Sequence, residues 1–296
     1  MTSFSEQPQG FTRGSLNGSS SSKRTLFNNV MNGVIFVCGL LALLPLGLVL
    51  SYLLIKGFSS LSLELFYKLP PAPLDTGGGF GNAILGTLIM VGIGALISVP
   101  IGVAAAVYLT EFSKGQTARS IRFATNVLSG VPSIIAGVVT YGILVGSKVT
   151  GYSAIAGGVA LSILMLPIIV RTTDEALQLV SNDLRQAAVG VGATNYQTVL
   201  LIVLPAALPS IITGVTLSVA RAAGETAPLI FTALFSFFWL ENLTDEPVAS
   251  LAVLVFNFAT SFDNNQQSVA WAASLVLVLM VLIASIIARF TTRSKS

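Results

Sequence analysis

Long apolar runs separated by polar segments dominate the chain, and six of these runs stand out. They cover residues 30–55, 83–109, 124–146, 155–170, 210–235 and 269–290. An α-helix rises about 1.5 Å per residue, so about 20 apolar residues cross the hydrocarbon core of a bilayer. All but 155–170 reach that length, and that run extends toward Gly151 or Thr173. The pattern predicts an all-α integral membrane protein with six transmembrane helices.

The amino-acid composition is typical of a protein whose surface faces the lipid of a bilayer. Of the 296 residues, 53% are hydrophobic and 9% are charged, whereas a soluble domain has about a quarter of its residues charged. The sequence contains no histidine and one cysteine, Cys38. Because histidine is the commonest general base and zinc ligand, its absence disfavours hydrolases and metalloenzymes. We expect no catalytic residues, no metal and no cofactor bound by this chain.

The first 25 residues differ from the rest. They are polar and rich in Ser, Gly and Asn, and they end near Lys23 and Arg24. Few apolar side chains are available there to offset the entropy of ordering, so we predict a disordered cytoplasmic tail over 1–25. The next apolar run is too long for a cleaved signal peptide. Residues 26–296 are expected to form one membrane domain.

The distribution of Lys and Arg predicts the orientation. With both termini in the cytoplasm, eleven of them lie inside: Arg13, Lys23, Arg24, Lys114, Arg119, Arg122, Arg171, Arg185, Arg289, Arg293 and Lys295. Three lie outside: Lys56, Lys68 and Lys148. This excess follows the positive-inside rule. Arg171, Asp174 and Glu175 are interpreted as an anchor and a solvated helix start, with a role in gating as the alternative.

Three connections are long. Segments 56–82 and 236–268 lie outside, and the apolar run 249–258 in the second is too short to span, so we expect it to lie along the interface or to re-enter. The glycine-rich run 77–81 is expected to form a flexible or tightly turned entry to the second span. Segment 172–205 lies inside.

The inside segment 172–205 predicts two short helices joined by a tight turn. The stretch 183–192 ends in Gly192, which suits a left-handed helix cap. Thr194 or Asn195 can then cap a second helix, which we expect Pro205 to stop. A loop of this length that only connects two spans is unusual, and that plain alternative stays open.

Two charges lie within the fifth apolar run. Arg221 and Glu225 are four residues apart, so they share one helix face and can pair. A charge at the bilayer centre is costly, and a guanidinium matches the oxygens of phosphate or sulfate. We interpret Arg221 as lining an anion pathway, with Glu225 holding it in place. The alternative is a buried pair that only fixes helix packing. Pro228 is expected to kink the helix just beyond.

Segment 172–205 also carries a family motif. ABC importer permeases have Glu-Ala-Ala, three residues, Gly, nine residues, Ile, one residue and Leu-Pro, and this chain matches at Gln186, Ala187, Ala188, Gly192, Ile202, Leu204 and Pro205. Only Gln186 departs from the pattern. The chain therefore resembles type I ABC importer permeases, in which this cytoplasmic coupling loop docks on an ATPase subunit. The resemblance implies a coupling role for these residues.

ATP hydrolysis is expected on a partner chain. No G-x-x-x-x-G-K-[ST] phosphate-binding loop occurs in the sequence. The nearest approach includes Gly142 and Gly146, which we interpret as a small-residue helix-packing face. We therefore expect a transporter subunit rather than an enzyme, with ATP and Mg on the partner ATPase.

Four further strings sharpen the resemblance, at 77–84, 131–134, 166–175 and 221–228. They are similar to phosphate-specific importer permeases, and most of all to the PstA-type subunit. That resemblance implies a pathway role for Arg221 and Glu225 in the inner membrane. It also implies four kinds of partner: a homologous PstC-type permease, an ATPase dimer, an external phosphate-binding protein and membrane lipid. No nucleic acid is expected, because basic residues do not cluster.

Three alternatives stay open at this point. The Arg–Glu pair would suit another oxyanion, such as sulfate or molybdate, and the loop would suit a permease for another small solute. An ion-driven secondary transporter would need internal repeats, which are not evident, and no docking loop. A regulatory membrane scaffold without a conduit is the third.

Overall fold

The computed structural model describes residues 23–113 and 115–293, and all regular structure in these ranges is helical. The predicted tail lies outside the described residues except for its last three residues, which begin the first helix. The chain divides into two compact units between Tyr52 and Leu53. Helix α1, Lys23–Ser59, contributes most of its length to the first unit. Its large apolar side chains there are exposed, as expected of a helix in lipid.

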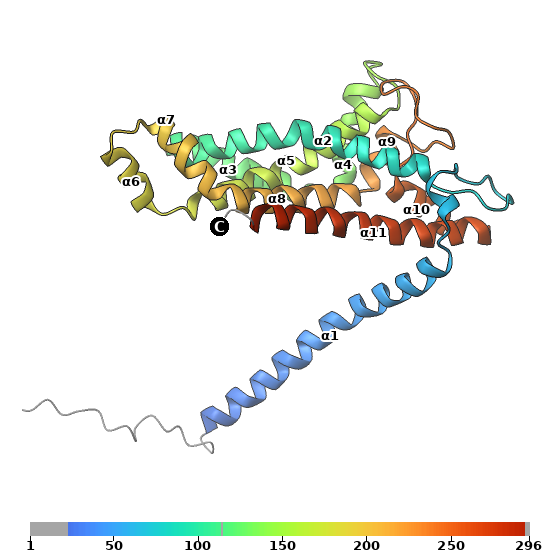
Figure 1. Ribbon diagram of the computed structural model, residues 1–296, viewed down its shortest axis with the longest axis horizontal. Coiled ribbons are helices and arrows are strands. Elements are labelled where there is room, and N and C mark those ends of the chain that lie inside the picture. The colour runs from blue at the N-terminus through green and yellow to red at the C-terminus, as the bar shows by residue number, and fades with distance from the viewer. Residues whose placement is uncertain (1–22, 114, 294–296) are drawn as a thin grey trace, which may run out of the picture. The chain divides into compact units, whose positions relative to one another are not determined.

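The second unit, residues 53–296, contains the remaining elements (Figure 1). In chain order these are η1 Leu63–Phe66, α2 Gly81–Val107, η2 Tyr108–Phe112, α3 Gln116–Ser129, α4 Ser133–Thr140, η3 Tyr141–Val145, α5 Ala154–Gln178, α6 Asn182–Gly190, α7 Asn195–Thr198, η4 Val199–Val203, α8 Leu204–Ala223, α9 Ala227–Thr232, α10 Leu251–Ala259 and α11 Asn264–Arg293. Elements η2, η3 and η4 are π-helical turns, and η1 is a 3₁₀ turn.

Five described helices are long and apolar enough to cross a membrane, or six if one bent pair counts as a span. The pair joins 116–129 to 133–145 with a bend of 99°. The span predicted over 124–146 is therefore not one continuous helix but corresponds to part of this bent pair. Pro132 explains the bend, because its ring clashes with the carbonyl four residues earlier and it has no N–H to continue the helix.

The predicted fifth span, 210–235, also needs correction. The continuous helical segment runs over Asn195–Ala223, and Pro205 does not stop it. The wider π turn Val199–Val203 precedes Pro205, which falls in the first turn of α8, where a missing N–H costs little. The helix ends instead at Ala223 and resumes as α9.

Helix α5 forms the centre of the second unit. It packs against α2, α8, α3 and α4, and Leu161, Met165 and Ile169 are fully buried among these helices. Close approach to α2 depends on glycine: a Cβ added to Gly102 would lie 2.7 Å from Cγ2 of Ile169. The fourth predicted span thus exists, and it extends to Gln178, through the first part of the predicted coupling loop.

The segments before α2 and around α10 pack tightly. Gly77 and Gly78 have positive φ angles of 80° and 86°, and the Gly79 N–H donates to the Leu69 carbonyl at 2.8 Å. The expectation of a tight turn before α2 is therefore confirmed. The apolar run 249–258 forms α10, which packs against α11 and α2.

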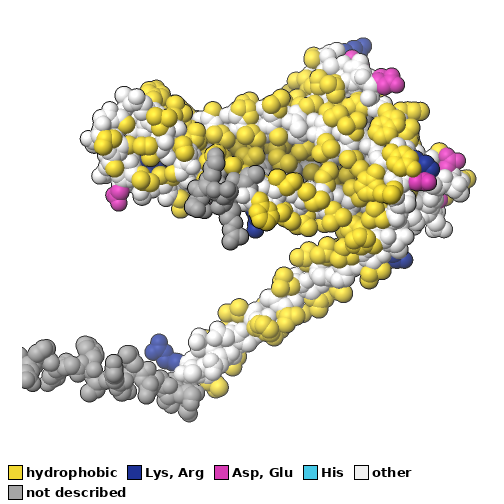
Figure 2. All heavy atoms as spheres, in the orientation of Figure 1, with side chains coloured by type: hydrophobic (Ala, Val, Ile, Leu, Met, Phe, Trp, Pro, Cys, Tyr) yellow, Lys and Arg dark blue, Asp and Glu magenta, His cyan; other side chains and the backbone are white. Residues whose placement is uncertain are grey.

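Gly142 and Gly146 pack against no other helix within the described residues of this chain, so their predicted helix-packing face stays a prediction. A Cβ added to Gly142 would meet nothing within 4 Å, and one added to Gly146 would meet only the backbone of Tyr141 and Gly142. Elsewhere the surface of the second unit suits lipid. Hydrophobic side chains cover much of the face in Figure 2, and most charged side chains visible on it lie toward the two ends.

Candidate functional site

The coupling loop folds as the sequence predicts at its turn. Gly192 has a φ of 91°. Its N–H donates to the Val189 carbonyl at 2.9 Å, and the Ala193 N–H donates to the Ala188 carbonyl at 3.0 Å. These two bonds form a Schellman motif, which satisfies the last carbonyls of α6. The left-handed glycine cap is therefore confirmed.

The second helix of the loop has a capping box. The Thr194 hydroxyl accepts from the Gln197 N–H at 3.3 Å, and the Gln197 side chain accepts from the Thr194 N–H at 2.8 Å. Two N–H groups that a helix start leaves unpaired are thereby satisfied. Of the two caps predicted, Thr194 rather than Asn195 fills this position.

The motif residues divide between the surface and the interior. Gln186, Ala187, Gly192 and Pro205 are exposed. Ala188 is buried, and Ile202 and Leu204 are half-buried within the helical segment that leads into α8. The exposed members leave one side of the loop accessible, while the others attach it to the rest of the unit.

Arg221 and Glu225 pair as their spacing predicts. The Nε of Arg221 lies 3.4 Å from Oε1 of Glu225, and the two side chains are 59% and 15% exposed. Arg221 lies in the last turn of α8, and Glu225 follows the end of that helix. The guanidinium is thus open to its surroundings while its carboxylate partner is largely enclosed.

Pro228 ends α8 earlier than expected. A helix continuing past Ala223 would bring the Pro228 ring against the Gly224 carbonyl, so the chain breaks at 224–226 and Pro228 enters the first turn of α9. The kink expected from Pro228 is therefore a full break of the helix, and it lies over 224–226, directly before the proline. Helix α4 lies directly on this region, because a Cβ added to Gly137 would be 2.6 Å from Cα of Pro228.

Helix α8 has two distinct faces. Gly214 and Ser218 are buried against α5, where the Ser218 hydroxyl donates to the Met165 carbonyl at 3.3 Å. A stripe of exposed residues at helical spacing runs along another face. It consists of Ser210, Thr213, Leu217 and Arg221. Arg221 therefore ends a partly polar exposed stripe.

The Arg221–Glu225 pair and the end of the predicted coupling motif lie at opposite ends of α8. Sixteen residues separate Pro205 from Arg221, which corresponds to about 24 Å along a helix. The structure therefore does not bring the two predicted sets of residues together. It connects them through one helix, α8.

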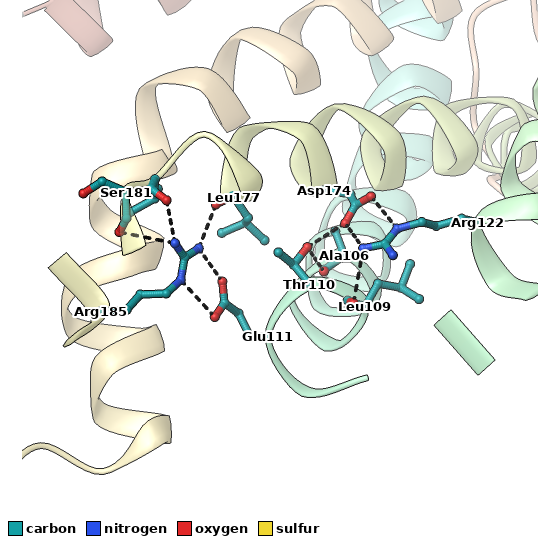
Figure 3. Close-up of polar contacts among 10 residues, drawn as sticks. Ala106, Leu109, Thr110, Glu111, Arg122, Asp174, Leu177, Ser181 and Arg185 are labelled. Carbon is teal, nitrogen blue, oxygen red and sulfur yellow. Dashed lines mark hydrogen bonds and ion pairs between the residues drawn. The ribbon is translucent and has the colours of Figure 1, made fainter. Parts of the chain in front are cut away.

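Charged residues near the coupling loop form pairs that the sequence did not reveal (Figure 3). Nε of Arg122 and Oδ2 of Asp174 are 2.9 Å apart, and Nη2 of Arg185 and Oε1 of Glu111 are 2.8 Å apart. Asp174 is buried, so the interpretation of it as a solvated residue is wrong. Arg171 and Glu175 pair with each other at 2.9 Å and are exposed.

Solved structures with the same arrangement of helices are ABC transporters. A bacterial alginate ABC transporter in complex with its alginate-bound periplasmic protein has a TM-score of 0.63 at 13% identity, covering 93% of this chain and 98% of that chain. The inward-facing MetNI methionine ABC transporter has a TM-score of 0.59 at 20% identity, covering 72% and 94%. These likenesses establish the fold.

Residues 98–295 match the family model of the binding-protein-dependent transport system inner membrane component. The fold and this match define the class: a multi-pass inner-membrane permease component of an ABC importer. The phosphate transport system permease protein PstA of Haemophilus influenzae is 40% identical over 273 residues, 92% of this chain and 96% of that protein. PstA 1 of Mycobacterium tuberculosis is 32% identical over 262 residues, 88% and 85%. The chain belongs to the PstA family of phosphate transport system permeases.

Proposed function

We propose that this chain forms half of the translocation pathway of an ATP-driven phosphate importer and that it couples this pathway to a separate ATPase. The observation that carries the proposal is the arrangement along α8. One end of this helix adjoins a capped loop whose family motif is partly exposed, and the other end bears the Arg221–Glu225 pair. A single helix thus connects a docking surface to an anion-binding group.

Arg221 is the group we assign to phosphate passage. Its guanidinium never loses its charge and offers a planar fork of donors that matches phosphate oxygens. With its side chain 59% exposed, the fork is accessible to a passing anion. Glu225 restrains the guanidinium at one edge and limits the net positive charge, so that a bound anion can leave again.

The coupling loop is the surface we assign to the ATPase. Gln186, Ala187 and Gly192 are exposed there. Because this chain has Gln186 where the family motif has Glu, docking would not use a carboxylate at that position. ATP and Mg²⁺ would bind the partner ATPase, and phosphate would cross without covalent change, so the chain is a transporter subunit.

The full assembly we propose has four kinds of protein chain. This chain would pair with a homologous PstC-type permease, and together they would bind an ATPase dimer inside and a phosphate-binding protein outside. Both termini would lie in the cytoplasm, in line with the excess of Lys and Arg on that side. Membrane lipid would surround the apolar faces.

Uptake of labelled phosphate and labelled sulfate, measured side by side, tests the proposal. The cells would carry wild-type chain, no chain, Arg221→Gln or Arg171→Gln. Arg171 is a matched control, because it also pairs with a Glu four residues on and its side chain is 60% exposed. A charge-assisted hydrogen bond contributes about 1.5–3 kcal/mol, so Arg221→Gln should lower phosphate uptake by about 10- to 100-fold.

The control variant should keep phosphate uptake, and sulfate uptake should not depend on the chain. Wild-type uptake in Arg221→Gln would mean that the pair only fixes helix packing. Loss of sulfate uptake in cells without the chain would assign a different solute to the same architecture.

A further inference from the structure

Four consecutive residues at the inner end of α2 contact four different elements. They are Leu109, Thr110, Glu111 and Phe112, and they lie in the π turn η2, Tyr108–Phe112. We call these four residues the π-turn junction. Short π-helical turns occur mostly as local insertions in α-helices and are frequent at functional sites.

The first two residues of the π-turn junction connect α2 to α5 and α3. The Thr110 hydroxyl donates to Oδ1 of Asp174 at 2.6 Å. Arg122 donates to both carboxylate oxygens of Asp174 at 2.9 Å, and its Nη2 also donates to the Leu109 carbonyl at 3.4 Å. Three helices therefore meet at one buried carboxylate (Figure 3).

The third residue connects α2 to α6, the first helix of the coupling loop. Nη2 of Arg185 donates to Oε1 of Glu111 at 2.8 Å, and its Nε donates to Oε2 at 3.4 Å. The same Nη2 donates to the Leu177 carbonyl at the end of α5 at 2.9 Å. The two charged side chains are only 20% and 10% exposed, so solvent screens their attraction weakly.

The fourth residue connects α2 to α7, the second helix of the coupling loop. The rings of Phe112 and Tyr196 stack with centroids 4.9 Å apart and an interplanar angle of 29°. Both helices of the coupling loop therefore contact adjacent residues of the same π turn. This turn lies 74 residues away from Arg185 in the sequence, so the connection is independent of the loop's own covalent joints to α5 and α8.

The opposite end of α2 is also held by side-chain hydrogen bonds to distant segments. Nδ2 of Asn82 donates to the carbonyls of Ser236 and Phe238 at 3.0 Å. The Leu251 N–H donates to the Thr87 hydroxyl at 2.9 Å, at the start of α10. Helix α2 thus connects the coupling loop, near α7, to the outer segment 236–251 near α9 and α10 (Figure 1).

We propose that the Arg185–Glu111 ion pair and the Tyr196–Phe112 stack make the coupling loop and α2 move as one body, so that α2 carries the motion of the ATPase to the outer segment. The inference rests on the proposed docking of the loop on an ATPase. Arg185 and Glu111 are positioning residues for transport, since they act through α2. The covalent joints of the loop to α5 and α8 run through the non-helical residues 179–181 and through the π turn Val199–Val203.

The test uses the complete importer, purified and placed in vesicles with phosphate-loaded binding protein, and it compares Glu111→Gln with wild type. Three quantities are measured: ATPase retained in the complex, basal ATP hydrolysis, and phosphate moved per ATP. We expect the ATPase and its basal hydrolysis to be retained, while phosphate moved per ATP falls by about fivefold or more. Glu175→Gln is the matched control, because it removes the carboxylate of an Arg–Glu pair within a single helix.

The outcomes separate this inference from the proposed function. If Glu111→Gln keeps the ATPase and moves phosphate per ATP as wild type does, the inference is wrong and the proposed function stands. If Glu111→Gln releases the ATPase, the pair serves docking and not transmission, and the inference is wrong. If the wild-type complex holds no ATPase, the proposed function itself fails.

A second experiment tests the inference even if a substitution impairs folding, because it compares the same sample before and after cross-linking. Phe112→Cys and Tyr196→Cys are combined in a Cys38→Ser background, and a short bifunctional thiol reagent then links the two positions. Breaking the stack should lower phosphate moved per ATP, and linking the positions should raise it again in the same sample. Each single-cysteine variant with the same reagent is the control. If the link lowers phosphate moved per ATP or leaves it unchanged, the coupling loop and α2 do not move as one body.

Discussion

Two Arg–Glu pairs in this chain have the same spacing but different surroundings. Arg171 and Glu175 have side chains that are 60% and 59% exposed, so water screens both charges. In the other pair the Arg221 side chain is 59% exposed and that of Glu225 is 15% exposed. The enclosed carboxylate fixes one edge of an accessible guanidinium. This asymmetry is the residue-level reason for assigning anion passage to Arg221.

Spacing predicted the Arg221–Glu225 pair because the two residues are only four positions apart in the sequence. It could not predict the pairs of Arg122 and Arg185, whose partners lie 52 and 74 residues away. The available signal was weak: Glu111 is an acidic residue directly after an apolar span, in a region where positive residues dominate. An acid in that position requires a partner, but the sequence does not say which.

Gly137 should be intolerant of even one methyl group. In Gly137→Ala the new Cβ would lie 2.6 Å from the Pro228 Cα, a backbone atom that cannot rotate away. We expect a loss of about 1–3 kcal/mol in the free energy of unfolding, as for other overpacked sites. Thermal unfolding of the purified protein in detergent would measure this.

The matched control is Gly142→Ala, where a Cβ meets nothing within 4 Å. It should unfold at or above the wild-type temperature. Equal unfolding temperatures for the two variants would show that α4 does not rest on α9 as described.

Local chemistry determines some helix ends in this chain and not others. Gly192 and Thr194 end and start helices through bonds to residues within five positions, so their roles could be predicted. The effect of proline depends on the hydrogen-bond register around it. Pro132 and Pro228 adjoin breaks, whereas Pro205 follows a π turn and sits within a continuous span. A π turn leaves no clear signal in the sequence, and the prediction for Pro205 was wrong for that reason.

The turn between α6 and α7 should depend on the backbone of Gly192. Its φ of 91° strains any residue with a side chain, although nothing lies within 4 Å of an added Cβ. Gly192→Ala should therefore destabilise the turn by about 1–2 kcal/mol and weaken retention of the ATPase by about five- to thirtyfold. Co-purification of the ATPase at increasing dilution would measure the change.

Gly190→Ala is the comparison for that variant, because Gly190 ends α6 and an added Cβ there also meets nothing within 4 Å. It should retain the ATPase as wild type does. Equal losses in both variants would mean that the surface of the loop, and not its turn, determines docking.

At the scale of the whole molecule, the apolar pattern predicted a helical membrane protein, and the family motif predicted the ABC importer class; both are confirmed. What the pattern could not predict is the way distant segments meet. Helix α2 contacts the coupling loop at one end and the outer segment 236–251 at the other, through bonds between residues 74 to 164 positions apart. Periodicity shows which face of a helix is apolar, but not which helix will cover it.

The most direct test of the account is phosphate uptake by vesicles that contain the complete importer, with ATP inside and phosphate-loaded binding protein outside. The account predicts uptake that requires both and that continues at the same rate when a protonophore removes the ion gradient. Uptake that stops with the protonophore while ATP remains constant would contradict it, because the chain would then belong to an ion-driven transporter.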